Sequence, residues 1–380
     1  MALRMLSMLV GSVLLLVAPA ANAVDGVTPQ QILIGQSITL QDGKSEYGSA
    51  VLAGVQAYLQ GANQRGGVNG RRIQLKTLDD HSRSEQAEAN ARQLIEQEKV
   101  FLLFGSVEGG PSTAVMRAAV DLKVPFFGPM AGAPALRSPH QPLVFPVRAE
   151  HVDEFRALLD YARKTGNSRV GFFRADSPTG LQHLENVKRA CRELGMDLVL
   201  DLPYPGTPSA VQIEKMAAQI GAAQAQVVIN HGSAGLYEQL IRKARALSTR
   251  VNFSGVNSGS TEMVQRLGPL AHGMVFAQVV PSPWERKSQI TREYQEEFAR
   301  QKPGVPFSYG SLEGYLTAKA LVSALRLAGS APTREKFVQA LDSAGGLDLG
   351  GLRAAYAPGE HTGLTLVDLA IVTREGKFRH

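Results

Sequence analysis

The sequence predicts an α/β fold built on doubly wound parallel sheets. A short apolar run at residues 101–104 (FLLF) is typical of a strand buried on both faces. A glycine-rich turn at 105–111 follows it, and then apolar residues recur at helical spacing over 112–122. A second short strand at 124–127 leads into another loop of small residues, 128–134. This order of strand, turn, helix and strand indicates a parallel sheet whose neighbouring strands are connected by helices.

The same alternation precedes that unit. Two strand–helix units are predicted there, and a tight turn at 66–70 joins the first unit to the second. The glycines of this turn and Asn69 tolerate positive φ. The first third of the chain is therefore a β-α-β-α-β-α-β succession. Its earlier elements are strands at 31–40 and 72–78 and helices at 48–63 and 84–98.

A second α/β unit follows the segment 142–148, which we expect to cross from one unit to the next. Its length suits a domain with its own core. The tail from Leu347 has strand-like patterns with turns at 358–359 and 375–376. We predict helices at 153–164, 181–194, 211–220, 236–247, 291–300 and 312–327, and strands at 169–173, 197–202, 226–230, 250–254 and 273–280.

The glycine-rich loops predict where a ligand binds. Both loops of the opening unit follow parallel strands, and open α/β sheets bind ligands at the carboxyl ends of their strands. Small residues let backbone N–H groups approach a ligand, and a helix N-terminus favours an anionic group.

The N-terminus predicts a secretory signal peptide at residues 1–23. It has a basic residue, Arg4, an apolar stretch at 8–17 and a small-x-small site at 21–23 (ANA). We expect cleavage after Ala23 and a periplasmic product. An N-terminal anchor is the alternative, but the apolar stretch is short for a membrane span.

Composition limits the classes of function. The chain has 380 residues, 44% of them hydrophobic, which is enough for two domains with substantial cores. Its single cysteine, Cys191, excludes an internal disulfide and is expected to be a buried helix residue. The formal net charge is +6, but the basic residues are scattered, so we expect no nucleic-acid partner.

No enzyme motif is present. The segment 231–235 (HGSAG) resembles a nucleophile elbow, but His231 stands where the first glycine is needed. There is no P-loop and no dinucleotide-binding glycine motif after the first strand. The run Asp79-Asp80-His81 lacks further spaced ligands, so we expect no metal and no cofactor. We therefore expect a protein that is not an enzyme.

At this point the chain resembles the type I periplasmic substrate-binding proteins of ABC transporters, in the branch of the leucine/isoleucine/valine-binding proteins. A subgroup of that branch is similar to the stretches at 279–284 and 347–369. The stretches that carry the family resemblance are IGQSITL (34–40), the helix 50–58, NQRGGVNGRRIQLKTLDD (63–80), KVFLLFGSV (99–107), VPFFGPMAGAPALR (124–137), FPVRA (145–149) and SLEGYLTAKALVSAL (311–325).

The resemblance implies a type I periplasmic binding protein with two lobes joined by three hinge crossings, near Arg148, Gln278 and Gly346. Lobe one would hold residues 24–147 and 279–346, and lobe two residues 148–278 and 347–380. A small-molecule ligand, an amino acid or an organic acid, binds between the lobes, which close on it by hinge motion. The closed monomer would then deliver the ligand to an ABC transporter permease. A sensor that presents its ligand to a receptor or kinase is the alternative function.

The resemblance also implies which loops line the cleft. Two come from lobe one, 106–112 and 130–133, and two from lobe two, 176–180 and 231–235, with 257–260 nearby. This chain departs from the amino-acid binders: it has no hydroxyl in 109–111 and no obvious carboxylate near Asn257. The ligand-binding residues predicted are Tyr47, Ser106, Glu108, Gly109, Gly110, Ser112, Met130, Ala131, Gly132, Ser177, His231, Ser258 and Gln278.

Five residues keep a second interpretation. Glu108 is either a partner for an ammonium group or a solvated loop charge. His231 donates to a ligand or bonds the backbone. Tyr47 covers a ligand or packs on its own helix. Trp284 is a packing residue or a platform for a ligand, with packing favoured. Glu313 either reaches the cleft or is a carboxylate at a helix start, stabilised by the helix dipole.

Overall fold

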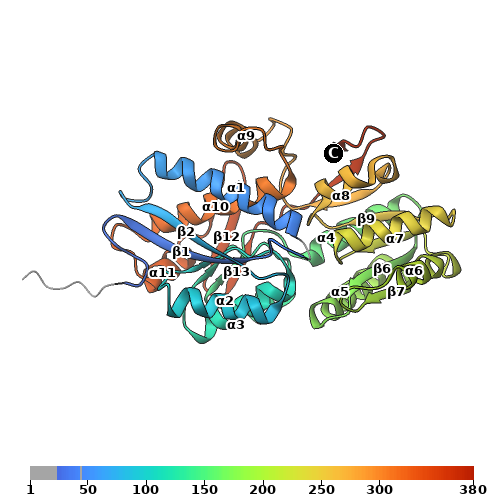
Figure 1. The fold of residues 1–380 in the computed structure, drawn as a ribbon, viewed down its shortest axis with the longest axis horizontal. Helices are drawn as coiled ribbons and strands as arrows, with labels where there is room; N and C mark the ends of the chain where they lie inside the picture. The colour runs from blue at the N-terminus through green and yellow to red at the C-terminus, as the bar shows by residue number, and fades with distance from the viewer. Residues whose placement is uncertain (1–23, 43–44) are drawn as a thin grey trace, which may run out of the picture.

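The computed structural model describes residues 24–42 and 45–380. The predicted signal peptide lies outside these residues, so its cleavage stays a prediction. No helix in the described part of the chain is long and apolar enough to cross a membrane. The chain forms two α/β lobes that lie side by side (Figure 1). The predicted fold class is confirmed.

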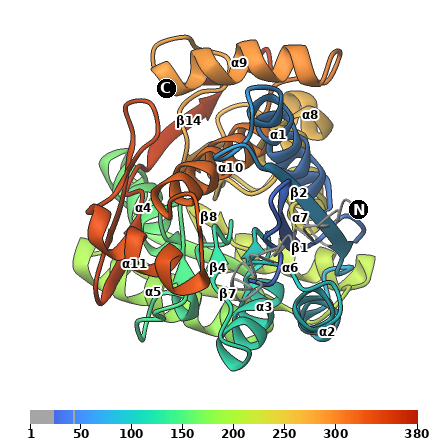
Figure 2. The same cartoon turned by 90° about the vertical axis from the view of Figure 1, so that its left-hand side faces the viewer.

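Within the described residues, the first lobe is built on a parallel sheet of five strands in the order β2-β1-β3-β4-β5. Ile32 and Ile34 belong to the core on one face, and Leu33 packs against the core on the other. Helices α1 and α10 cover one face and α2 and α3 the other (Figure 2). The elements of this lobe are β1 Gln31–Ile38, α1 Ser45–Gln64, β2 Arg72–Asp79, α2 Ser84–Glu96, β3 Leu103–Phe104, α3 Gly109–Asp121, β4 Phe126–Phe127, η1 Pro134–Leu136, β5 Val144–Phe145, α9 Gln289–Gln301, α10 Tyr309–Leu327 and α11 Arg334–Ala344.

Helices α1 and α10 pack backbone against backbone. A Cβ on Gly54 would lie 1.9 Å from the carbonyl oxygen of Ser311, and one on Gly314 would lie 2.1 Å from that of Val51. Only glycine fits at either contact. This close crossing sets the position of Tyr47 and Glu313, which lie near the starts of the two helices.

Over the same described residues, the second lobe has a sheet of seven strands in the order β15-β14-β10-β9-β8-β6-β7. Strands β6 to β10 are parallel, and β14 and β15 add antiparallel to the edge at β10. Cys191 is buried on α5, as predicted. The elements are α4 His151–Lys164, β6 Arg169–Ala175, α5 Pro178–Leu194, β7 Asp197–Tyr204, α6 Ala210–Ala222, β8 Val227–Asn230, α7 Ala234–Ala246, β9 Asn252–Gly255, α8 Ser260–Leu267, η2 Gly268–Ala271, β10 Val275–Gln278, β14 Asp368–Val372 and β15 Phe378–Arg379.

A small antiparallel sheet corrects the predicted third crossing near Gly346. It consists of β11 Leu347–Asp348, β12 Arg353–Ala357 and β13 Glu360–Gly363. Tyr356 Oη donates to the carbonyl oxygen of Pro146 at 2.9 Å, and His361 Nδ1 lies 2.7 Å from that of Val144. The sheet therefore packs on lobe one, and of the segment 347–380 only β14 and β15 join the sheet of lobe two.

Two local expectations also need correction. Residues 142–148 were expected to cross between units, but Val144 and Phe145 pair with β4 and add a fifth strand to the first sheet. The turn at 105–111 was expected to precede the next helix, but α3 already begins at Gly109, with Glu108 at its N-cap. Gly109 and Gly110 are therefore helical residues in the first turn.

Candidate ligand-binding cleft

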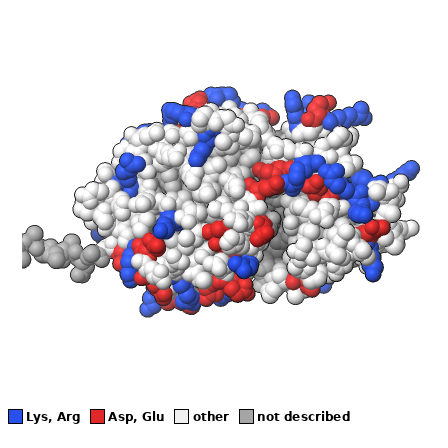
Figure 3. Space-filling view, viewed as in Figure 1, with Lys and Arg blue, Asp and Glu red and all other residues white. Residues whose placement is uncertain are grey.

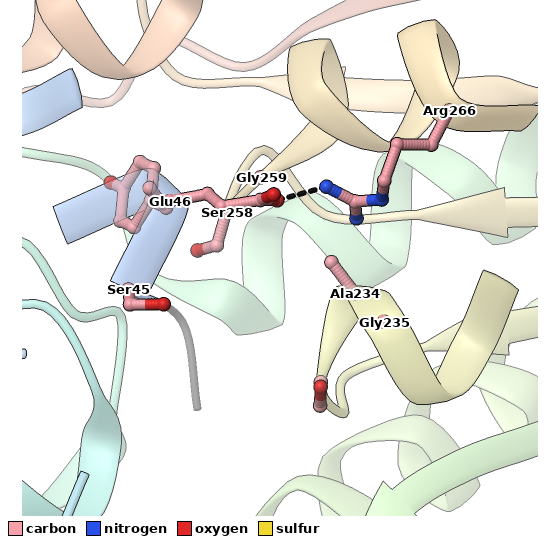
Figure 4. A pocket seen from close by; sticks show the side chains of 9 residues that line it. Ser45, Glu46, Ala234, Gly235, Ser258, Gly259 and Arg266 are labelled. Carbon is pink, nitrogen blue, oxygen red and sulfur yellow. Dashed lines mark hydrogen bonds and ion pairs between the residues drawn. The ribbon is translucent and has the colours of Figure 1, made fainter. Parts of the chain in front are cut away.

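A cavity of about 210 Å³ lies between the lobes. Figure 3 shows the surface hollowed there, with charged side chains beside the hollow. Lobe one contributes the start of α1, and lobe two contributes the loops after β8 and β9, the start of α7 and part of α8 (Figure 4). The lining residues are Ser45, Glu46, Tyr47, Ser233, Ala234, Gly235, Ser258, Gly259 and Arg266.

An ion pair joins the lobes beside this cavity. Arg266 on α8 binds Glu46 on α1, and its Nε lies 2.6 Å from Glu238 Oε2 on α7 (Figure 4 shows the first contact). Burial alone would lower the pKa of Arg266, but the two carboxylates raise it above its ordinary value. The Glu46 side chain is 57% exposed, so solvent screens the pair that spans the lobes.

Five buried polar residues form what we call the floor cluster: Tyr47, Arg148, Glu154, Asn257 and Glu313. Tyr47 Oη donates to Glu313 Oε2 at 2.6 Å, and Asn257 Nδ2 donates to the same oxygen. The backbone N–H of Asn257 donates to Glu154 Oε1 at 3.1 Å. Arg148 binds Glu154, and its Nε lies 3.8 Å from Glu313 Oε1. The cluster therefore links α1 and α10 of lobe one to α4 and the loop after β9 of lobe two.

Burial and charge shift the pKa values of the floor cluster. Burial alone would lower the pKa of Arg148, but Glu154 and Glu313 outweigh it and raise the value. The pKa of Tyr47 is raised well above its usual range by burial and then by the charge of Glu313. Arg148 faces two carboxylates, and His151 Nδ1 also lies 2.6 Å from Glu154 Oε2.

Four buried polar atoms around this cluster have no hydrogen-bond partner among the residues that the structure describes. They are Arg148 Nη1, Asn257 Oδ1, Ser258 Oγ and Gln278 Oε1. Buried polar atoms in folded proteins are nearly always paired with protein or water. These atoms include both donors and acceptors, so they suit a polar guest that itself carries both.

The two lobe-one loops predicted to line the cleft, 106–112 and 130–133, form what we call the rim of lobe one, and the loops 176–180 and 231–235 form the rim of lobe two. Ser106 Oγ and Ser112 Oγ lie 2.6 Å apart, and both residues are fully buried. Ser82 Oγ donates to Glu108 Oε1 at 2.9 Å. A Cβ on Gly109 would lie 2.8 Å from Thr179 Cγ2 of lobe two, so the two rims are in contact. Gly110 lies in the same first turn of α3.

The second loop of lobe one lies against the start of α4. Met130 and Ala131 are buried, and a Cβ on Gly132 would lie 2.4 Å from the backbone nitrogen of His151. That nitrogen donates to the carbonyl oxygen of Gly132 at 3.1 Å. This contact holds the loop to lobe two beside the first crossing.

On lobe two, the predicted residues have separate positions. Ser177 is the N-cap of α5, and its Oγ accepts from the Gly180 N–H at 3.1 Å. His231 follows β8 and lies against two other histidines. Gln278 Nε2 lies 3.3 Å from Ser260 Oγ, and Ser258 lines the cavity. Of the thirteen predicted site residues, only Tyr47 and Ser258 line the cavity itself.

A carboxylate beneath the first rim has a raised pKa. Asp80 Oδ1 accepts from Thr39 Oγ1 at 2.7 Å and from the Ser82 N–H at 3.0 Å. Burial raises the pKa of Asp80 to about 6. Burial alone would also raise the pKa of Asp79, but N–H donation from Leu40 and His81 lowers it.

Comparison with known proteins follows this geometry. Residues 31–377 match the family model described as periplasmic binding protein. The chain belongs to the periplasmic binding protein family. This result confirms the predicted resemblance to the leucine/isoleucine/valine-binding branch.

Relatives of this periplasmic binding protein are distant in sequence. The Leu/Ile/Val-binding protein homolog 7 of Brucella abortus (strain 2308) is 22% identical over 286 residues, 72% of this chain and 71% of the relative. The structure of a possible leucine/isoleucine/valine-binding protein from Rhodopirellula baltica SH 1 has a TM-score of 0.86 at 26% identity, covering 95% of this chain and 98% of that one. A branched-chain amino acid ABC transporter structure from Thermus thermophilus with bound valine has a TM-score of 0.81 at 22% identity, covering 92% and 95%.

The structure of this periplasmic binding protein bears on several of the open interpretations. Glu313 is part of the floor cluster, and Tyr47 both bonds Glu313 and lines the cavity. The Trp284 ring stacks on Phe378, with centroids 5.6 Å apart, which favours packing. Glu108 bonds Ser82 across the base of the rim.

Arg148 and Glu154 were not predicted as site residues. Each belongs to an ordinary local pattern, a crossing segment and an amphipathic helix. The one available signal was a charged residue, Arg148, in an otherwise apolar segment at a crossing.

Proposed function

We propose that this chain is an extracytoplasmic solute-binding protein that captures a small amino-acid-like or organic-acid ligand between its lobes. In this proposal a signal peptide cleaved after Ala23 directs it to the periplasm. The closed monomer then delivers its ligand to the permease of an ABC importer. It performs no chemistry on the ligand.

The floor of the cleft is the observation that carries this proposal. A cavity lies between the lobes, and beside it are buried donor and acceptor atoms with no partner among the described residues. A ligand that pairs these atoms stabilises the closed arrangement, because unpaired buried polar groups are costly. The cavity volume, about 210 Å³, is below the range of drug-sized sites and suits a small metabolite.

The chemistry of these atoms suggests how a ligand is oriented. We assign Arg148 Nη1 and Ser258 Oγ to a ligand carboxylate, since both donate hydrogen bonds. Asn257 Oδ1 and Gln278 Oε1 then accept from a ligand ammonium or hydroxyl.

The packed rims have a smaller part in this proposal. Backbone N–H groups at 109–112 and 130–132 bound the cleft on the side of lobe one, and Ser177 and His231 bound it on lobe two. The hydroxyls of Ser106, Ser112 and Ser177 are engaged within the protein. We therefore place direct ligand contacts at Tyr47 and Ser258 before those at Ser106 and Ser112.

Mass spectrometry of small molecules released from the freshly purified, exported protein tests the proposal. A released amino or organic acid, added back, is expected to raise the melting temperature, since a hundredfold excess over Kd stabilises by about 2.7 kcal/mol. Turnover of the bound molecule would contradict the proposal.

The identity of the released ligand also shows which ligand chemistry the cleft selects. An amino acid supports the orientation assigned above. If the released ligand is an acid without an ammonium group, the proposed function stands. Asn257 and Gln278 would then accept hydrogen bonds from a ligand hydroxyl or from water. Cross-linking of the ligand-bound protein to a permease, rather than to a receptor or kinase, separates transport from sensing.

A further inference from the structure

Three of the chain's eight histidines meet at one edge of lobe two. His151 is the first residue of α4, His183 lies in the second turn of α5, and His231 follows β8. Ligand nitrogens from the three lie within 4.8 Å of one another. They are separated by dozens of residues in sequence, so the fold alone brings them together.

The environment of this histidine cluster has the features of a metal site. His183 is fully buried and His151 is 3% exposed, whereas His231 is half-buried and leaves a route from solvent. Glu154 Oε2 lies 2.6 Å from His151 Nδ1, so this carboxylate orients the imidazole ring. A carboxylate behind a histidine is the usual outer-sphere support of a histidine ligand.

We propose that His151, His183 and His231 bind one divalent transition-metal ion of the Zn²⁺ class. Imidazole nitrogens suit such ions, and three protein ligands leave a fourth position for water or another oxygen donor. Tetrahedral Zn–N bonds of about 2.0–2.1 Å need nitrogens about 3.3 Å apart. Side-chain movements of about an ångström bring the three nitrogens to that spacing.

The position of the site links it to the cleft. The backbone N–H of His151 donates to Gly132 of lobe one, and Glu154 joins His151 to the floor cluster. A metal ion at the three histidines therefore holds the start of α4 where lobe one contacts it. This inference goes beyond solute capture, and its test contains no organic ligand.

The test is calorimetric titration of ZnCl₂ into protein that carries no polyhistidine tag and has been dialysed against chelator. We expect one saturable site with a Kd in the micromolar range or below. His231→Gln and His183→Gln are each expected to weaken Zn²⁺ binding at least tenfold. His272→Gln is the matched control, since His272 is exposed and outside the cluster, and it is expected to leave the affinity unchanged.

Co²⁺ provides a second readout. Its visible absorption in the wild-type protein is expected to have the intensity of a four-coordinate ion and to be lost in His231→Gln. His231 is half-buried at a strand end, so this variant keeps the test valid if His183→Gln fails to fold. No saturable binding, or binding that both cluster variants leave unchanged, would overturn the site. Either result leaves the search for an organic ligand unaffected.

Discussion

The floor cluster and the first-lobe rim are two polar edges of the same cleft, and they are built differently. The rim comes from short neighbouring segments, and its hydroxyls bond one another, as Ser106 and Ser112 do. The floor joins residues far apart in the chain, such as Tyr47 and Glu313, which are 266 positions apart. The floor cluster binds across the lobes, and beside it lie donor and acceptor atoms that have no hydrogen-bond partner among the described residues. The rim is thus suited to shape the cleft, and the floor to hold a ligand and the lobes together.

The largest expected effect tests the floor. Arg148→Met removes the guanidinium that two buried carboxylates share, and leaving such charges uncompensated costs about 3–5 kcal/mol. We expect a fall of that size in the free energy of unfolding, measured by urea denaturation. Arg156→Met is the control, because Arg156 pairs with Glu193 at the exposed surface. Such an ion pair contributes about 0–1 kcal/mol to the free energy of unfolding. Equal losses of unfolding free energy in the two variants would show that the floor cluster stabilises the fold no more than a surface ion pair does.

The second prediction concerns the support beneath the rim. The pKa of Asp80 is about 6 in the folded protein, above the ordinary value of about 3.9. Between these values the folded state holds a proton that the unfolded state has lost, so stability falls as pH rises through about 4–6. We expect Asp80→Asn to abolish this dependence and to stabilise the protein at pH 7 by about 1–3 kcal/mol.

Asp79→Asn is the matched control for that pH profile. The pKa of Asp79 is lowered in the folded protein, so its contribution to stability is present above the ordinary pKa and is lost as pH falls through the folded value. This variant is therefore expected to be less stable than wild type at pH 7. Urea denaturation between pH 4 and 7 measures both variants. A difference in unfolding free energy between wild type and Asp80→Asn that does not change with pH would disprove the raised pKa of Asp80.

A pair of serine substitutions compares the two edges directly. Ser258→Ala removes a cavity-lining hydroxyl that has no hydrogen-bond partner within residues 24–42 and 45–380. Ligand affinity is therefore expected to fall by about 0.5–1.5 kcal/mol with stability unchanged. Ser112→Ala breaks a buried bond, so stability is expected to fall by a similar amount with less effect on affinity. Calorimetry with the identified ligand and urea denaturation separate the two. The reverse pattern would move the ligand's anion site to the rim.

The smallest effect is expected at the exposed ion pair. Glu46→Gln removes the partner of Arg266 across the cleft, but Glu238 still binds that guanidinium. We expect ligand affinity to change by less than about 1 kcal/mol, and the change to shrink as salt is raised. A loss as large as that from Arg148→Met would show that this pair, and not the floor, holds the lobes together.

The same contrast explains what the sequence predicts and what it does not. Strands such as 101–104 follow from local spacing, and so β1 to β4 of the first sheet were predicted, whereas β5 was not. The third crossing was misplaced because the hydrogen bond from Tyr356 to Pro146 has no local signature. Arg148 and Glu154 were missed as site residues because their contacts with Glu313 and Asn257 come from segments far away in the sequence.

The crystal structure of the protein with its co-purifying ligand tests the central claim most directly. The account predicts ligand density between the lobes, within hydrogen-bond distance of Arg148 Nη1 and Ser258 Oγ, with the floor cluster intact. Density held only by the rim residues Ser106 and Ser112, with no ligand atom within hydrogen-bond distance of Arg148 Nη1 or Ser258 Oγ, would contradict it.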